Sequence, residues 1–497
     1  MKKMDSLREE GVRLYVSFML LVFPLFYKNG YYDILRAKRS VYLNMTGLFL
    51  IFILCTVIVD ISQKRVGVQK IQITKRILWL VYMALVLTIS TMLSDNRADS
   101  WWGLSGRYLG SVLLILGCIT VVVIEKYLIW EPYMTCLFLA GASGIYILQI
   151  LNEWKIDPLH MGVAKEENAA GYFTGTFGNL NFNAQFNVMS LAVVMTLFLL
   201  SENRKLGVLY KIVLILGLWG SICCRSDSVL FGVFVIVLIL LIYCLKTQRS
   251  RKNMSEIFGC IFIANLLMVI CYSHFSENVF ALAGAMKILL QKQTLMIEVL
   301  LYAVSQLCIR NHVVNQTIKN HKRKVIVIML SAVLAFCIWQ FKKWNGIEAA
   351  AMIQEWANGR EYIWKRSWEM FRDFSWREKL FGCGTNRFGD RIYAVYGEEM
   401  MSLFGMRYID AHNEYLHFLV TTGILGVLGY FGGILSVLIR SIHVCAENKN
   451  ALIAITGVCA FLAAAMCNGP QPATTPLLFV ELGIFSAIIR KKELSEN

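Results

Sequence analysis

The segment 225–246 reads RSDSVLFGVFVIVLILLIYCLK, and it determines the fold class. Its centre, 229–245, contains no charged residue. At about 1.5 Å per residue, an apolar helix of this length with its flanks can cross a hydrocarbon core of ~30 Å. Arg225 and Lys246 stand on either side of the run. The stretch therefore predicts a membrane-spanning helix between two polar connections.

Similar apolar runs recur along the whole chain. We find about fourteen of them, each of roughly 15–24 residues, and they begin near Leu14, Val41, Ile77, Tyr108, Tyr133, Phe186, Val208, Val229, Ile257, Thr294, Val325, Tyr415, Ala451 and Thr474. Charged residues make up only 16% of the 497 residues, whereas soluble domains carry about 25%. The sequence predicts an all-α polytopic membrane protein with about 12–14 transmembrane helices.

The distribution of Lys and Arg predicts the orientation, because basic residues near span ends stay in the cytoplasm. With the N-terminus inside, the cytoplasmic segments hold about 26 Lys and Arg and the short external loops about 10. The run near Leu14 is followed by no small-residue cleavage site, so we expect it to remain as an anchor. One loop, with Lys28, Arg36, Lys38 and Arg39, opposes this topology. Either the first run is re-entrant or that loop is an exception.

Two hydrophilic segments divide the chain. The longer one separates an N-terminal bundle of about eleven spans, 1–341, from about three C-terminal spans in 412–497. It occupies 342–411, and a connection of this length is more often functional than structureless. A shorter segment lies at about 152–183. The topology places both outside the plasma membrane, and we expect the chemistry in 342–411.

The net charge and the cysteine content do not indicate a nucleic-acid partner or a cysteine-based site. The net charge of +16 comes mostly from residues at membrane edges, where anionic lipid and topology account for it, so nucleic acid is not expected as a partner. The 14 cysteines form no CxxC pair and lie mostly within apolar runs, which is typical of small apolar fillers. The expected partners are therefore the lipid bilayer and substrates bound at its surface.

A short amphipathic helix is predicted within the long segment, in NGREYIWKRSWEMF at 358–371. Asn358 can cap its N-terminus with Glu361 as the reciprocal partner. Apolar and small residues recur at helical spacing at Ile363, Trp364, Ser367 and Phe371. Arg360 then falls in the first turn, where it could hold a phosphate oxygen together with unpaired backbone N–H groups. The alternative is an interfacial arginine that extends to lipid headgroups.

The stretch DAHNEYL at 410–416 precedes a long apolar run. Asp410 is a candidate cap, which would place His412 and Asn413 in the first turn of a membrane helix. The positive helix end disfavours protonation of the imidazole, while Asp410 favours it. A neutral histidine here could act as a general base. The alternative is an interfacial histidine bonded to a loop carbonyl.

Two further arginines occupy predicted external connections. Arg107 lies in WWGLSGRYLG, and Arg225 lies in SICCRSDSVLF, between two strongly apolar runs. An arginine near membrane depth costs a few kcal/mol unless it is paired, so a functional role is the default interpretation. For Arg225 the alternative is a simple ion pair with Asp227.

Several short motifs, in order, resemble the O-antigen ligase and polymerase family. They are GTFGNLNFNAQ at 175–185, CRSDS at 224–228, NGREYIW at 358–364, LFGCGTNRFGD at 380–390 and AHNEYLHFLVTTGILGVLGY at 411–430. The resemblance covers roughly 101–438, and the opening VFPLFYKNGYYDILRAKRSVYL is similar to the variant found in Gram-positive bacteria. Each motif is weak alone, whereas the combination is specific.

The resemblance implies a polytopic glycosyltransferase similar in fold to the shape, elongation and division peptidoglycan polymerases. It implies transfer of a glycan from polyprenyl diphosphate to an acceptor hydroxyl outside the plasma membrane, with inversion and without a metal or other cofactor. Arg225 and Arg360 would bind the diphosphate, and His412 would contact or deprotonate the acceptor. Arg107, Asn413 and Trp364 are expected to bind substrate.

The turn FGCGTNRFGD departs from the family pattern by carrying Asn386 and Arg387. Arg387 could contact phosphate, but we favour a solvated side chain. Two other classes of function remain: a transporter or flippase of lipid-linked sugars, and a non-catalytic membrane scaffold or sensor. Few mid-span charges and no recognisable repeat oppose the transporter. The sequence does not decide between polymerase and ligase.

Overall fold

The structure is a computed structural model, and it describes residues 2–30, 33–63, 75–161, 175–282, 284–311, 321, 324, 331 and 360–490. These residues are mostly helical and contain no strand, which confirms the predicted all-α class. The apolar run predicted near Val325 and the predicted cap Asn358 lie outside them.

The N-terminal half of the described chain forms a succession of helices. They are α1 (Lys2–Ser17), the π-helical η1 (Phe18–Val22), α2 (Phe23–Leu25), α3 (Ile34–Ser62), α4 (Lys75–Leu93), α5 (Arg97–Trp102), α6 (Ser111–Tyr127), α7 (Pro132–Glu153), η3 (Gly175–Phe177), α8 (Leu180–Leu200), α9 (Arg204–Cys223) and α10 (Asp227–Cys244). The rest comprises α11 (Gln248–His274), η4 (Gly284–Leu290), α12 (Lys292–Arg310), α16 (Arg360–Asp373), α17 (Trp376–Phe381), α18 (Phe388–Phe404), α19 (Glu414–Val444), α20 (Ala451–Ala465) and α21 (Thr475–Arg490). Every predicted apolar run within the described residues coincides with one of these helices.

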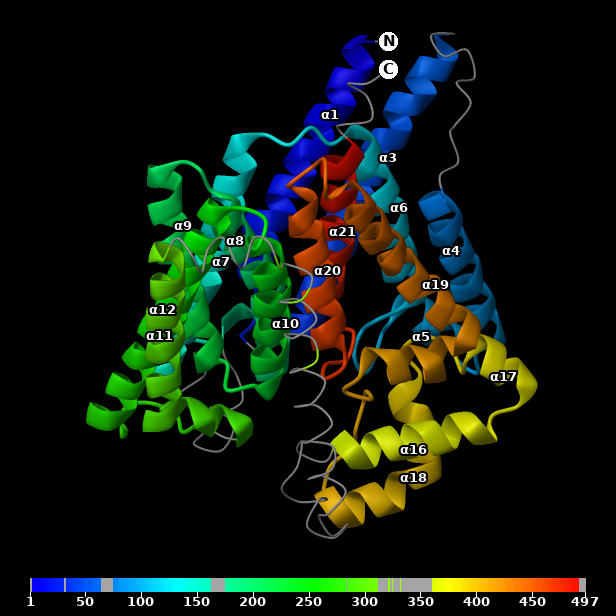
Figure 1. The fold of residues 1–497 in the computed structure, drawn as a ribbon. Helices are drawn as coiled ribbons and strands as arrows, with labels where there is room; N and C mark the ends of the chain where they lie inside the picture. Colours follow the sequence, from blue (N-terminus) through cyan, green and yellow to red (C-terminus); the bar gives the residue numbers. More distant parts are fainter. Residues whose placement is uncertain are drawn as a thin grey trace.

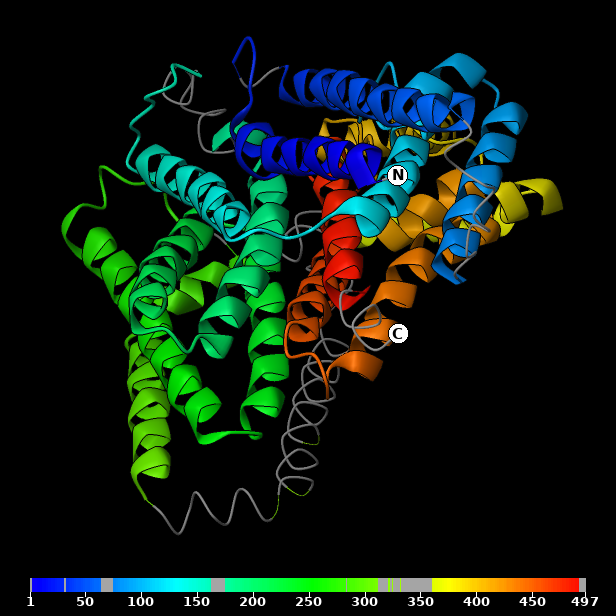
Figure 2. The ribbon, with the colours of Figure 1, turned by 90° about the horizontal axis from the view of Figure 1, so that it is seen from above.

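Eight of the described helices are long and apolar enough to cross a membrane: α3, α7, α8, α9, α10, α11, α12 and α19. Ile77–Leu93 and α20 are apolar but shorter. Helix α8 is the most enclosed, with 83% of its apolar window buried, and it packs against α9, α10 and α20. Figure 2 shows α8, α20 and α21 in the middle of the bundle. The protein is therefore a multi-pass membrane protein with a helical core.

The two ends of the bundle differ. The start of α1 and the C-terminal end of α21 lie at one end, and α16, α17 and α18 lie at the opposite end (Figure 1). This arrangement agrees with a topology in which the termini share one side of the membrane and the long hydrophilic segment occupies the other.

Lys38 is one of the basic residues whose position opposed the predicted orientation, and its contacts explain why it is there. It lies within α3 and is fully buried. Its Nζ donates to the carbonyl oxygens of Phe23 at 2.9 Å and Pro24 at 3.0 Å. These carbonyls belong to α2, and a cation is favourable beside the carbonyl end of a helix. Lys38 thus attaches α2, the end of the N-terminal segment formed by α1, η1 and α2, to α3.

The layer formed by α16, α17 and α18 has an apolar core of its own, which also includes residues of α19. In α16, Ile363, Ser367 and Phe371 are buried on one face, as the helical spacing predicted. Trp368 and Trp376 are 54% and 80% exposed, which suits indole rings at a membrane interface. The amphipathic helix predicted in the long segment is therefore present.

A glycine-rich turn attaches this layer to a kink in α19. The backbone N–H of Cys383 donates to the Val420 carbonyl at 3.0 Å, and that of Gly384 donates to the Thr421 carbonyl at 2.9 Å. Gly423 has a φ of +68° inside α19, and a Cβ there would lie 2.4 Å from the backbone of Leu380. Only glycine fits this close contact in that conformation.

Candidate functional site

Helix α19 begins three residues later than a cap at Asp410 would require. Its N-cap is Asn413, whose side-chain oxygen accepts the backbone N–H of Leu416 at 3.1 Å. The predicted cap at Asp410 was therefore wrong, and His412 precedes the helix instead of lying in its first turn. His412 adopts a φ of +47°, a conformation that non-glycine residues adopt infrequently. The turn directs its imidazole toward Asp410.

Asp410 holds His412 by two contacts. Its Oδ1 accepts the backbone N–H of His412 at 2.7 Å and lies 3.3 Å from the imidazole Nδ1. Its Oδ2 accepts a hydrogen bond from Nε of Arg107. Gly469 packs directly on the carboxyl group, and a Cβ there would approach it to 2.9 Å. Asp410 is 1% exposed, whereas the side chain of His412 is 24% exposed.

The charges around His412 set its protonation state. Burial lowers its pKa, the Asp410 carboxylate opposes this effect, and the guanidinium groups of Arg107 and Arg360 reinforce it, so that the net direction is downward. Burial raises the pKa of Asp410, but Arg107 and His412 outweigh it and hold that pKa below its usual range. A neutral imidazole therefore lies beside an ionised carboxylate. The carboxylate favours the tautomer with its proton on Nδ1, which leaves Nε2 as the proton acceptor.

Arg360 is the first residue of α16, and it contacts the N-terminus of α8. Its Nη2 donates to Oδ1 of Asn181 at 3.0 Å. The same oxygen accepts the hydroxyl of Ser226, the N-cap residue of α10, at 2.8 Å. Asn181 thus joins the beginnings of α8, α10 and α16. Helix N-termini carry partial positive charge, so together with Arg360 they favour an anion in this region.

Arg107 joins the same region from a connection before α6. Besides its ion pair with Asp410, its guanidinium lies over the ring of Phe182, 5.1 Å from the centroid. Phe182 belongs to the first turn of α8, next to Asn181. The structure therefore brings Arg107, Arg360 and His412 close together. That they form a common functional site stays a prediction.

Trp364 and Asn413 use their polar groups to support this site. The indole N–H of Trp364 donates to the carbonyl of Ala411 at 3.0 Å, immediately before His412. The side-chain oxygen of Asn413 is engaged in the cap of α19. Both residues lie beside the turn that carries His412, and their predicted contact with substrate stays a prediction. In the described contacts they fix the conformation of the turn that carries His412.

Arg225 contacts a different set of residues from those around the histidine. Its Nε lies 3.4 Å from Oε2 of Glu153, and its guanidinium lies over the ring of Phe280 at 4.6 Å. The side chain is only 7% exposed, and Nε and Nη2 form no hydrogen bond within the described residues. The predicted alternative partner was wrong, because the Asp227 carboxylate accepts the backbone N–H of Met286 instead. The neighbour of Arg225, Ser226, links it to the Arg360 group through the hydrogen bond to Asn181.

The expectation that Arg387 is solvated was also wrong. Its side chain is 12% exposed and forms ion pairs with Asp95, Asp99 and Asp390. Asn386 donates to Asp99 at 3.0 Å and accepts the backbone N–H of Leu109 at 3.2 Å. The turn that departs from the family pattern therefore ties the connection that carries Arg107 to the α16–α18 layer.

Sequence reasoning missed a network of buried polar residues near the site. Glu414 is fully buried and accepts hydrogen bonds from Gln185 at 2.8 Å and Tyr430 at 3.0 Å. Gln471, from the connection before α21, shares this network through Thr474, whose hydroxyl donates to Gln185. A signal was available in NGPQ at 468–471, because turn residues that interrupt an apolar region mark a specific backbone conformation.

The comparisons with known proteins identify a family for the part of the chain that carries most of this site. A family model described as O-antigen ligase matches residues 190–431. That range includes Arg225, Arg360 and His412, and it ends before Gly469 and begins after Arg107. A search of curated proteins found no match.

Proposed function

Because residues 190–431 belong to the O-antigen ligase family, we propose that the protein is a membrane glycosyltransferase acting on a polyprenyl-diphosphate-linked glycan. The acceptor is a hydroxyl group, and the reaction takes place on the external face of the plasma membrane. The α16–α18 layer lies at the end opposite the start of α1 and the C-terminal end of α21 (Figure 1), which supports an external catalytic layer if the basic terminal segments are cytoplasmic.

The donor diphosphate binds at Arg360. This side chain projects from the first turn of α16 onto Asn181, where the N-termini of α8 and α10 also meet. The leaving group develops negative charge as the glycosidic bond breaks, and fixed positive groups stabilise that charge. Arg225 belongs to the donor site by family resemblance, and two of its guanidinium nitrogens have no hydrogen-bond partner within the described residues.

The acceptor hydroxyl is deprotonated by His412. Nε2 takes the hydroxyl proton while the oxygen forms a bond to the anomeric carbon of the donor. The bond from that carbon to the diphosphate oxygen breaks, and polyprenyl diphosphate leaves with the bonding electrons. Attack opposite the leaving group inverts the configuration. Asp410 holds the Nδ1 proton and stabilises the imidazolium that forms, as the carboxylate does in other histidine–aspartate pairs.

One observation carries the proposal: an ionised Asp410, fixed by Arg107, lies 3.3 Å from Nδ1 of His412. A histidine that only bonded a loop carbonyl would need no such partner. The arrangement gives a base with a defined tautomer next to cationic groups suited to a diphosphate.

Reconstitution tests this function. Purified full-length protein in lipid nanodiscs receives a defined polyprenyl-diphosphate oligosaccharide, alone or with a candidate glycan acceptor. His412→Gln is expected to reduce turnover by about 10²–10⁴-fold, the usual contribution of a general base. His443→Gln is the matched control, because His443 is exposed near the other end of α19. A ladder of products identifies a polymerase and a single transfer identifies a ligase, whereas undiminished turnover by His412→Gln refutes the assignment.

A further inference from the structure

A large cavity opens at the end of the molecule opposite the α16–α18 layer. It has a volume of about 1330 Å³ and is lined by residues of α1, α7, α8, α10, α20 and α21. Its rim carries charges of both signs: Asp5, Glu9, Lys126, Lys246, Glu447, Lys449 and Arg490. Most small-molecule sites measure about 300–1,000 Å³, so this cavity, which we call the vestibule, can admit an organic ligand.

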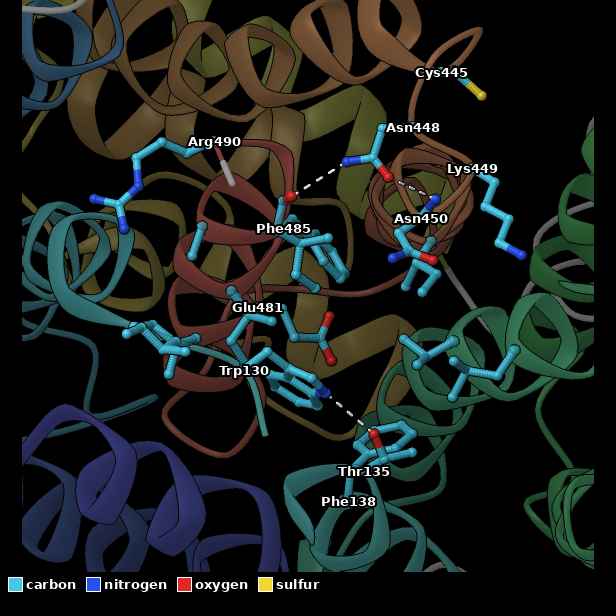
Figure 3. A pocket seen from close by; sticks show the side chains of 18 of the residues that line it. Trp130, Thr135, Phe138, Cys445, Asn448, Lys449, Asn450, Glu481, Phe485 and Arg490 are labelled. Atoms are coloured by element: carbon cyan, nitrogen blue, oxygen red, sulfur yellow. Dashed lines mark hydrogen bonds between the residues drawn. The ribbon is translucent and has the colours of Figure 1, made fainter. Parts of the chain in front are cut away.

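Glu481 projects into the vestibule below this rim. It lies on α21, nine residues before Arg490, which corresponds to roughly 13 Å along a helix. Figure 3 shows its carboxylate directed into the open space near Trp130. Within the described chain no residue forms a hydrogen bond or ion pair with Glu481. A carboxylate without a partner inside a membrane domain is costly, so Glu481 is stable there either as the neutral acid or, when ionised, beside a cation in the space that it faces.

Aromatic rings surround this carboxylate. Trp130, Phe138 and Phe485 line the vestibule, and Figure 3 shows them grouped around Glu481. The Trp130 indole is oriented by a hydrogen bond from Nε1 to Oγ1 of Thr135 at 3.2 Å. The faces of indole and phenyl rings attract cations, and aromatic enclosures are used to bind quaternary ammonium groups.

The nature of the site favours an organic cation over other ligands. Within the described residues no group of three or more His, Cys, Asp or Glu side chains could hold a metal ion, and a divalent cation needs several oxygen ligands. A lipid chain lying tail-inward would place methylene groups against the carboxylate, which is unfavourable. An ammonium group on an apolar body satisfies both the carboxylate and the aromatic walls.

The charges at the rim do not oppose a cation. Lys449 is paired with Glu202 at 2.7 Å, and Arg490 donates to the backbone carbonyl of Lys126. Lys246 lies over the ring of Tyr243, 4.5 Å from the centroid. These basic groups are engaged at the rim, and the acidic residues there offset their charge, whereas Glu481 is the charged side chain in the interior of the vestibule.

We propose that the vestibule binds an organic ammonium ion, with the Glu481 carboxylate as its counter-ion and the rings of Trp130, Phe138 and Phe485 as its walls. The site is separate from the candidate glycosyltransferase site, which lies toward the other end of the bundle. Its existence does not depend on the proposed reaction.

Equilibrium dialysis of tritiated benzyltrimethylammonium against the full-length protein in nanodiscs tests this site. The wild type is expected to bind the probe saturably, with a stoichiometry near one. Glu481→Gln preserves the size of the side chain and removes its charge, so we expect binding to weaken at least about tenfold. Trp130→Leu is expected to weaken binding severalfold while leaving the carboxylate in place.

Glu447→Gln is the matched control, because it removes a carboxylate from the rim of the same vestibule and should change affinity by less than about twofold. Glu481→Asp retains the charge, and it should bind more tightly than Glu481→Gln if both variants remain monodisperse. The proposal is overturned if the wild type shows no saturable binding, if neutral benzyl alcohol displaces the probe equally well, or if Glu481→Gln binds like the wild type.

Discussion

Replacement of Asp410 by Asn tests the proposed chemistry most directly. The substitution keeps an acceptor for the backbone N–H of His412, so the turn should persist, but it removes the charge 3.3 Å from Nδ1. At that separation Coulomb's law gives about 1 kcal/mol with the dielectric constant of water and about 5 kcal/mol with an effective value near 20. His412 is 24% exposed, so an intermediate loss of about 3 kcal/mol is expected in the transition state. Turnover should fall about a hundredfold.

The dependence of turnover on pH should also change, and the direction of the change can be predicted. The Asp410 carboxylate raises the pKa of His412 against the opposing effects of burial and of Arg107. Removing the carboxylate therefore lowers the pKa of His412 further. The acidic limb of the profile of turnover against pH should move to lower pH, while the plateau falls because the base is weaker. A purely structural role for Asp410 would lower the plateau without moving the limb.

The assay is the initial rate of transfer from a defined polyprenyl-diphosphate oligosaccharide, measured from pH 5 to 9 in nanodiscs. Asp373→Asn is the matched control, because that carboxylate is exposed at the end of α16. Because Asp410→Asn also leaves Arg107 buried without its partner, the folded fraction must be checked by size-exclusion chromatography and thermal melting. A folded Asp410→Asn protein with wild-type turnover, or with its acidic limb at higher pH, refutes the reasoning.

Three further substitutions probe the donor site and the fold. Arg360→Gln should raise the KM for the lipid-linked donor by about tenfold or more, as one charge-assisted contact to phosphate is lost, and a changed kcat with an unchanged KM would argue against donor binding. Glu153→Gln should destabilise the protein by about 3–5 kcal/mol, because it leaves Arg225 buried and unpaired; a melting temperature equal to that of the wild type would contradict this. Gly423→Ala should prevent correct folding, whereas Gly433→Ala, with only a side-chain atom at 3.8 Å, should be tolerated in the same fluorescence-detected size-exclusion assay.

The sequence was sufficient for the fold class because apolar length is a local property. The length and apolar composition of a run such as 229–245 predict a membrane helix by themselves, and this prediction does not depend on distant residues. The amphipathic face of α16 was predictable for the same reason, since Ile363, Ser367 and Phe371 follow the period of one helix. Predictions of this kind need only neighbouring residues.

The pairing of charges was not predictable from local pattern. Arg107 and Asp410 are separated by 303 positions, and only the packing of the long segment onto the bundle brings them together. Sequence proximity was misleading for Arg225. It suggested Asp227 as the partner of Arg225, whereas the observed partner, Glu153, lies at the end of α7.

The start of α19 shows how a local rule can fail by a few residues. Asp410 and Asn413 are both good N-cap residues, and the sequence alone gave no reason to prefer one of them. The contacts of Asp410 decide the matter, because its carboxylate is occupied by the guanidinium of Arg107 and by the backbone N–H of His412, so it does not cap the N–H groups of the first helical turn. Asn413 then caps the helix, and His412 is left in the turn between them.

This division of roles explains why the site tolerates a histidine with a positive φ. Strain of this kind costs on the order of 1–3 kcal/mol and persists only when surrounding contacts enforce it. Here the contacts are the hydrogen bond from the His412 backbone to Asp410 and the hydrogen bond from Trp364 to the neighbouring Ala411 carbonyl. The conformation turns the imidazole toward the carboxylate instead of along the helix. Under the proposed mechanism, Trp364, predicted as a substrate contact, acts through the geometry of the base, and Trp364→Phe should lower kcat while leaving the KM for the donor unchanged.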